Sequence, residues 1–137
     1  MGIDISPTAL DVARTRFPDM DFAEVNLNDC SVFEGYINQY YGENPGRRGW
    51  GVDLVFSAEL FSYLENWKDL LSLLSTKTRF LMVTLYLPEN PIGFVKTPQE
   101  LEEAIAGHFA IIESVRLKKS RFTVVFAKTL LPDTAST

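Results

Sequence analysis

Cysteine and histidine are scarce in this chain, with one residue of each among 137. Cys30 has no partner for an internal disulfide, and no spacing of cysteine and histidine suits a structural zinc site. No stretch approaches the roughly 20 apolar residues of a membrane-spanning helix, and no signal peptide is recognisable. These absences indicate a protein of the reducing cytoplasm that has no metal site and does not enter a membrane.

Basic residues are also too few for a nucleic-acid-binding protein. Lysine and arginine number 13 against 18 acidic residues, which gives a net charge of -5. A protein that binds the phosphate backbone needs a dense basic face, and this chain has only one tight basic cluster, at 118–121. We interpret that cluster as a solvated hairpin and expect a small-molecule substrate rather than a nucleic acid.

The lone cysteine and histidine allow one alternative. Cys30 and His108 can be written as a nucleophile and its base. The plainer interpretation puts Cys30 in a turn after a strand and His108 just after Gly107, at the carbonyl end of a helix, where a cation or a cap is stabilising.

What remains is an ordinary globular composition, 46% apolar and 23% charged. A chain of this length forms one domain that buries roughly two thirds of its unfolded surface. We place the domain at 1–129 and a flexible tail at 130–137.

Hydrophobic periodicity predicts alternating strands and helices. The predicted strands are 2–5, 21–25, 52–57 and 79–87, the helices are 7–17, 31–41, 66–75 and 98–107, and a loop fills 42–51. Two closing strands, 110–118 and 121–128, lie too close together for any connection but an antiparallel hairpin. The pattern predicts an α/β fold whose mostly parallel sheet has helices on both faces and ends in an antiparallel hairpin.

Two of the predicted helices carry clear start signals. Ser6 precedes Pro7, so its hydroxyl can accept from the free amides of the first turn. Thr97 precedes Pro98 and stands three residues before Glu100, which is the pattern of a capping box.

Two motifs and the hairpin resemble class I S-adenosylmethionine-dependent methyltransferases. "GIDIS" at 2–6 is similar to the family's second strand, and "VDLVFSAELFSYL" at 52–64 is similar to its fourth strand and the segment after it. The resemblance covers nearly the whole chain. It implies a three-layer Rossmann-like sheet whose last strand is antiparallel and lies beside the fifth, with S-adenosyl-L-methionine as cofactor above the carboxyl ends of the first strands.

The resemblance implies a binding site for the nucleoside part of the cofactor. Asp4 would accept from both ribose hydroxyls, because one carboxylate offers two matching acceptor oxygens. Ile5 would pack on the adenine, Asn26 would accept from its amino group, and the Leu27 amide would donate to a ring nitrogen. Two alternatives stay open: Asp4 is also a common helix-start residue, and Asp29 could replace Asn26 or serve only as a turn residue.

The resemblance also assigns residues beyond the adenosine. Ser57 and Ala58 would leave room for the methionine end of the cofactor, and Tyr63 would orient the acceptor or take its proton as the catalytic residue.

Three more residues would contact the substrate, namely Glu59, Phe61 and Tyr86. The loop at 87–94 would be a lid or a substrate loop. For Phe61 and Tyr63 the alternative is a place in the core, as is usual for aromatic residues before a helix.

The family's first strand and its G-x-G-x-G turn are absent from the sequence, and Ser75 to Thr78 replace its usual Pro-Gly-Gly. In the family that strand lies between the second and the fourth, so we expect a gap between 2–5 and 52–57. We expect the missing strand upstream of Met1. Otherwise the two strands pair directly, or a homo-oligomer completes the sheet edge.

The sequence therefore predicts methyl transfer from S-adenosylmethionine to a small-molecule acceptor. The alternatives are a noncatalytic partner subunit and a nicotinamide-dinucleotide-binding domain. The closing hairpin and "SAELFSYL" argue against the last of these.

Overall fold

The computed structural model describes residues 1–41 and 52–131, so the loop predicted at 42–51 lies outside the described residues. Strands and helices alternate as predicted. In chain order they are β1 (Gly2–Asp4), α1 (Pro7–Arg16), β2 (Phe22–Glu24), α2 (Cys30–Tyr41), β3 (Val52–Ala58), the 3-10 helix η1 (Phe61–Tyr63), α3 (Trp67–Lys77), β4 (Thr78–Tyr86), α4 (Pro98–Ala106), β5 (Phe109–Leu117) and β6 (Phe122–Thr129).

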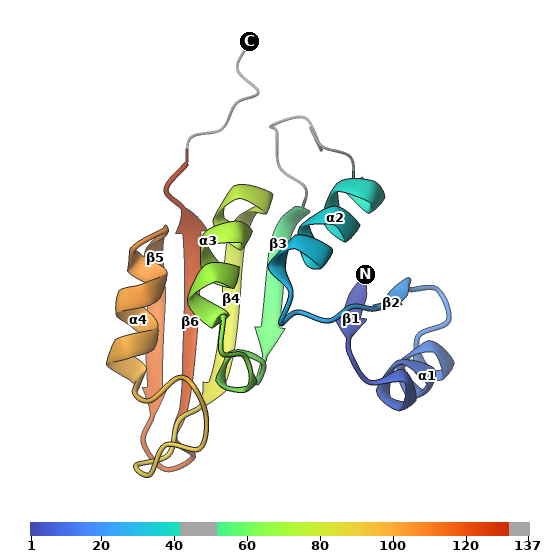
Figure 1. The fold of residues 1–137 in the computed structure, drawn as a ribbon. Helices are drawn as coiled ribbons and strands as arrows, with labels where there is room; N and C mark the ends of the chain where they lie inside the picture. The colour runs from blue at the N-terminus through green and yellow to red at the C-terminus, as the bar shows by residue number, and fades with distance from the viewer. Residues whose placement is uncertain (42–51, 132–137) are drawn as a thin grey trace.

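The strands form two sheets (Figure 1). One sheet is the parallel pair β1 and β2, and the other has four strands in the order β3-β4-β6-β5. Strands β3 and β4 are parallel, whereas β6 is antiparallel to both β4 and β5. The predicted hairpin is confirmed, and its second strand lies beside β4, as the resemblance implied.

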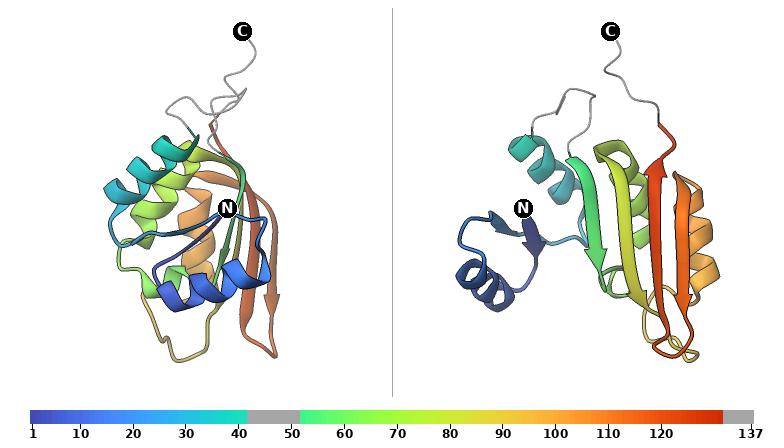
Figure 2. Two further views of the ribbon diagram at one scale, coloured as in Figure 1. Left: turned by 90° about the vertical axis from the view of Figure 1, so that its right-hand side faces the viewer. Right: turned by 180° about the vertical axis from the view of Figure 1, so that it is seen from behind.

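A gap separates the two sheets between β1 and β3. Both strands point the same way in Figures 1 and 2, yet they belong to different sheets. The alternative in which these two strands pair directly is therefore wrong. The chain shows the expected gap instead.

The helix-start signals produce the expected caps. Ser6 Oγ accepts from the Ala9 amide at 3.2 Å, and Thr97 Oγ1 accepts from the Glu100 amide at 3.0 Å. Glu100 Oε1 accepts from the Lys96 amide at 3.3 Å, one residue before the position that a capping box uses. Both helices are thus fixed by residues that the sequence identifies.

The core lies between the four-stranded sheet and the helices α2, α3 and α4. Figure 2 shows these helices on one side of that sheet. Inward side chains from every layer are buried together, among them Ile37, Leu71, Val83, Ile105 and Val125.

The opposite face of the four-stranded sheet carries no helix in the described residues (Figure 2, right). Outward side chains on β3 are consequently open, with Leu54 51% and Phe56 58% exposed. Helix α1 lies beside β1 and β2, where only its Leu10 is buried. The structure thus differs from the expected three layers, because α1 alone does not cover the second face.

The start of α2 differs from expectation. Cys30 opens α2 instead of lying in the preceding turn. Leu130 donates its amide to the His108 carbonyl at 3.1 Å, so the chain stays attached just past β6. The flexible tail predicted at 130–137 lies mostly outside the described residues, from 132 onward.

Candidate functional site

A cavity of about 630 Å³ lies between β1 and β3. Its floor is apolar and comes from helices α2 and α3, through Phe33, Ile37, Leu70 and Leu74. Its rim is formed by the carboxyl ends of β1, β2 and β3. The volume is within the range of ligand cavities in proteins.

The structure brings all six residues predicted to bind cofactor to this cavity. They are Asp4, Ile5, Asn26, Leu27, Ser57 and Ala58. They come from three strand ends that are far apart in the sequence. The fold therefore creates the shared rim that the binding prediction needs.

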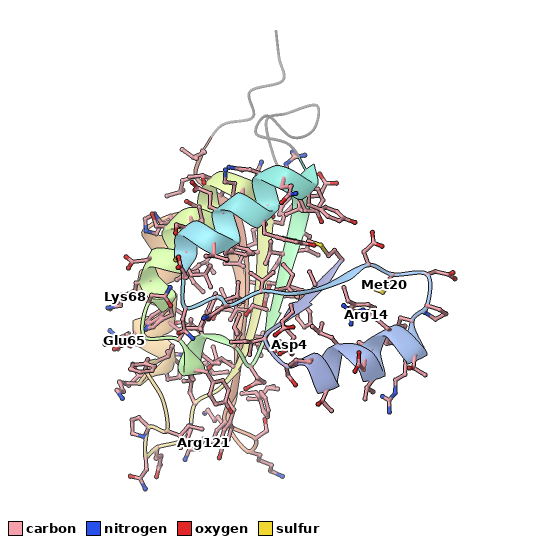
Figure 3. The ribbon with its side chains drawn as sticks, turned by 45° about the vertical axis from the view of Figure 1, so that its right-hand side comes forward. Asp4, Arg14, Met20, Glu65, Lys68 and Arg121 are labelled. Atoms are coloured by element: carbon pink, nitrogen blue, oxygen red, sulfur yellow. The ribbon has the colours of Figure 1, made fainter. Side chains whose placement is uncertain are left out.

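The local sequence at the junction of β1 and α1 explains where the Asp4 side chain lies. Its Oδ1 accepts from the Ser6 amide at 2.9 Å, which holds the carboxylate beside the start of the helix. The side chain is exposed, and Figure 3 shows it between α1 and the four-stranded sheet. No group in residues 1–41 and 52–131 donates a hydrogen bond to Asp4 Oδ2, so this oxygen can accept from a ligand.

The rim at the end of β2 is polar as well. Asn26 Oδ1 accepts from the Asn28 amide at 3.0 Å, which uses one of the two lone pairs of the amide oxygen. Leu27 is half-buried beside it.

Asp29 instead caps α2. Its Oδ1 accepts from the amides of Ser31 and Val32 and from the Ser31 hydroxyl at 2.7 Å. The hydrogen bond from the Ser31 hydroxyl is the main cause of the lowered pKa of Asp29, and the hydrogen bond from the Val32 amide is the second. Because this carboxylate stabilises the helix start, the structure favours the turn interpretation over a substitute for Asn26.

Ser57 provides an independent sign of a binding site. The residue is 6% exposed and lines the cavity, and its Oγ has no hydrogen-bond partner in the described part of the chain. A buried hydroxyl without a partner is costly, and a ligand in the cavity could satisfy it.

Glu59 has an unusual backbone at the end of β3. Its φ is 58°, a left-handed conformation that is uncommon for residues other than glycine. Oε2 accepts from the Tyr86 amide at 2.8 Å, while Oε1 is buried and finds no partner among the described residues. Such strain is often found at functional sites.

The residues predicted to act on the acceptor do not all reach the cavity. Phe61 does, but as a fully buried core residue whose ring lies 6.3 Å from that of Trp67. Tyr63 is 71% exposed on η1, and neither Tyr63, Glu59 nor Tyr86 lines the cavity. The Tyr86 ring lies 5.6 Å from that of Phe122 instead.

The loop at 87–94 is attached to η1 and held at both ends. The Phe94 amide donates to the Ser62 carbonyl at 2.9 Å. Leu87 and Val95, at the two ends of the loop, are buried. Its Glu89 forms an exposed ion pair with Arg121 at 2.8 Å. Whether the loop acts as a lid stays a prediction.

Sequence reasoning missed Asn66, which precedes α3. Its Nδ2 donates to the carbonyls of Leu27 and Asn28 and to Cys30 Sγ, at 3.1 to 3.2 Å. Asn66 thereby holds the rim segment after β2 against α3. An asparagine before a helix signals an N-cap, but this side chain makes no cap bond.

Cys30 has the environment of a structural residue. Desolvation raises the pKa of its thiol, although the Asn66 hydrogen bond opposes this. Among residues 1–41 and 52–131, no group of three or more histidine, cysteine or acidic side chains could hold a metal. In the same residues no helix has the length and apolar character needed to cross a membrane.

No protein-family model matches the sequence, and no curated protein matches it. Among solved structures the chain is similar to the PH0226 protein of Pyrococcus horikoshii OT3. The TM-score is 0.59 over 93% of this chain and 70% of that one, at 10% sequence identity. At this identity the likeness concerns the fold alone. The chain has a mixed α/β fold that is compatible with a Rossmann-like one.

Proposed function

We propose that the chain binds S-adenosyl-L-methionine at the cavity rim and serves methyl transfer to a small-molecule acceptor. One observation carries the proposal. Three strand ends place Asp4, Asn26 and Ser57 on a single rim, the arrangement that the methyltransferase resemblance implies. The site also follows the general rule that ligands of open α/β sheets bind outside the carboxyl ends of the strands.

Asp4 is the proposed ribose ligand. The Ser6 amide fixes Oδ1, so the carboxylate is oriented before a ligand arrives, and little freedom is lost on binding. The two carboxylate oxygens then accept from adjacent hydroxyls in charge-assisted hydrogen bonds.

The other rim residues suit the remaining parts of the cofactor. Ile5 and Leu27 offer apolar contacts to a base, and the free lone pair of Asn26 Oδ1 can accept from an amino group. Ser57 Oγ needs a partner, and Ala58 leaves space beside it. When bound, S-adenosylmethionine supplies an electrophilic methyl group, and the chain's contribution is to position the acceptor and exclude water.

Glu59, Phe61, Tyr63 and Tyr86 remain the proposed acceptor-side residues. The buried Phe61 would act by shaping the cavity floor. The hydroxyl of Tyr63 is accessible only from outside the cavity, so it would orient an acceptor that enters over η1. Glu59 does not line the cavity, and its carboxylate would hold the end of β3 beside the acceptor through the hydrogen bond that it accepts from the Tyr86 amide.

A noncatalytic partner subunit is the second candidate. It is favoured by the absence of a G-x-G-x-G run, because the family uses the backbone amides of that turn to hold the methionine carboxylate. The remaining rim would then bind the cofactor weakly or not at all.

Calorimetry with S-adenosylmethionine tests the proposal on the 137-residue chain. We expect binding that Asp4→Asn weakens about tenfold or more, since charge-assisted hydrogen bonds are lost. Asp11→Asn is the matched control, because it removes the same charge from an exposed site on α1 and should change the affinity less than twofold. The absence of any binding by the unaltered chain would favour the noncatalytic subunit, and equal affinities of the two variants would remove Asp4 from the site.

A further inference from the structure

The loop at 87–94 and the turn at 118–121 lie together at one end of the molecule. Figures 1 and 2 show both segments at the lower end, beyond the carboxyl end of β4. The two segments are joined directly, because the Leu87 amide donates to the Arg121 carbonyl at 2.9 Å and the Arg121 guanidinium pairs with Glu89. We call this surface the loop end and define it by residues 87–96 and 118–121.

Large apolar side chains are exposed on the loop. Ile92 is 66% exposed, and Phe94 on the other side of Gly93 is about half exposed. The Phe94 amide donates to the Ser62 carbonyl, so the loop is fixed against η1 while these two side chains stay in water. Apolar side chains that are held outward together in this way indicate an interaction surface.

Basic side chains accompany the apolar pair. Lys118, Lys119 and Arg121 stand together in the exposed turn. Lys96 Nζ donates to the Gly93 carbonyl at 2.5 Å, which holds its ammonium group beside the apolar part of the loop. The loop end therefore carries four basic side chains against one acidic side chain, although the whole chain has a net charge of -5.

This combination suits the surface of an anionic membrane. Apolar side chains enter the headgroup region, while each lysine or arginine near the surface is attracted to anionic lipids. A nucleic acid would use the same basic charges but would leave Ile92 and Phe94 in water. Because the rest of the chain is acidic, an anionic surface attracts the loop end and repels the other faces, which sets the orientation of the protein.

We propose that the loop end docks the protein on an anionic membrane surface. Ile92 and Phe94 lie at the level of the lipid headgroups, and the basic turn lies beside their phosphates. This contact needs no spanning helix, so it differs from the membrane-spanning chain that the sequence argues against. The proposal goes beyond the proposed function and does not rest on cofactor binding or methyl transfer.

Cosedimentation of the 137-residue chain with lipid vesicles tests the proposal. The vesicles contain phosphatidylcholine alone or phosphatidylcholine mixed with phosphatidylserine, and S-adenosylmethionine is left out. We expect the chain to bind the phosphatidylserine vesicles at least about fivefold more tightly, and we expect added salt to weaken this binding. The absence of binding to phosphatidylserine vesicles, or equal binding to both kinds, would overturn the proposal.

A matched pair of isoleucine variants tests the apolar contact. Ile92→Ser should weaken binding to phosphatidylserine vesicles at least about threefold, because an apolar side chain no longer enters the headgroup region. Ile112→Ser is the control, since Ile112 is also exposed but lies within β5, away from the turn. Neither substitution opens the core. Equal binding by the two variants would overturn the proposal.

A pair of lysine variants tests the basic contact. Lys119→Gln should weaken vesicle binding about fivefold, the effect of one charge near an anionic surface. Lys77→Gln should leave binding unchanged, because Lys77 precedes β4 at the end of that strand opposite the loop. Equal losses in both variants, or a loss in neither, would count against docking through the loop end.

Competition with double-stranded DNA distinguishes a lipid surface from a general polyanion. We expect excess DNA to leave the chain on the phosphatidylserine vesicles, since DNA offers no apolar layer for Ile92. Displacement by DNA would assign the loop end to polyanions in general and overturn the proposal.

Discussion

Gly93 marks the closest approach of the 87–94 loop to η1. A Cβ at this position would fall on the Ser62 carbonyl, which is backbone and cannot turn aside. The neighbouring hydrogen bond from Phe94 to Ser62 requires this approach. Glycine is thus needed here for space and not for a special φ.

We expect Gly93→Ala to destabilise the protein by about 1–3 kcal/mol, the usual cost of overpacking. Gly35→Ala is the control, because nothing lies within 4 Å of its added Cβ and it sits inside α2. That control should gain up to about 1 kcal/mol from helix propensity. Urea unfolding measures both changes, and a Gly93→Ala variant as stable as the parent would contradict the argument.

Single residues also show what the sequence could and could not reveal. Ser6 and Thr97 were predictable as caps because capping depends on neighbours in the chain. The contact of Asn66 with Leu27 was not, because it depends on how α3 packs against the segment after β2. The burial of Ser57 was equally hidden, since serine is mostly exposed.

At the scale of elements, an ion pair fastens α4 to β5. Arg116 donates to both carboxylate oxygens of Glu102, at 3.2 and 2.6 Å, and the Ser114 hydroxyl donates at 2.6 Å. The Arg116 hydrogen bonds are the main cause that lowers the pKa of Glu102, although desolvation opposes them. The pair holds a helix on the outermost strand of the sheet.

This lowered pKa predicts a loss of stability in acid. A carboxylate whose pKa is lowered by folding contributes its full stabilisation above the pKa of an unfolded glutamate, about 4.3. It loses that stabilisation as the pH falls through the pKa of the folded state. Glu102→Gln should cost about 1 kcal/mol at neutral pH, because Arg116 is half exposed and water weakens the pair. The difference from the parent should vanish in acid.

Urea midpoints measured from neutral pH to about pH 3 check this expectation. Glu103→Gln serves as control, since it removes the same charge from the same helix, and among the described residues its carboxylate accepts only from Gln99. A difference in urea midpoint between Glu102→Gln and the parent that stays constant at every pH would count against the ion pair.

The order of elements was predictable because apolar spacing and helix starts are local signals. The runs at 52–57 and 79–87 were long and apolar enough to be identified as strands. Local signals do not show which strands lie beside these two in the sheet. The place of β6 between β4 and β5 came from the resemblance, because nothing in the hairpin itself says which of its strands faces β4.

For the whole molecule, the expected gap is present, but the sheet face without a helix in the described residues was not predicted. Periodicity in β4 and β6 shows apolar residues on both faces, as in Met82 and Val83, and this pattern predicts helices on both sides. The sequence cannot show that α2, α3 and α4 all lie on one side of the four-stranded sheet, because that depends on the direction in which each crossover moves. The sequence could predict which residues belong to the candidate site. That they share one rim could be seen only from the folded structure.

The position of β6 has a consequence for how the protein is made. Strand β6 comes last among the described strands, yet it lies inside the sheet and pairs with β4 from Phe80↔Lys128 to Tyr86↔Phe122. A chain still lacking β6 has β5 with no neighbour and β4 with an open edge. The sheet therefore closes only after its final strand leaves the ribosome.

Nascent chains stalled on the ribosome would show this delay. We expect chains that end near Leu117 to be digested quickly by a protease, and chains in which Thr129 has cleared the exit tunnel to resist it. Protease resistance at the shorter length would mean that β3 and β4 fold stably without β6, which would contradict this prediction. Until β6 has left the ribosome, the edges of β4 and β5 that it pairs with therefore stay open to proteases and to other chains.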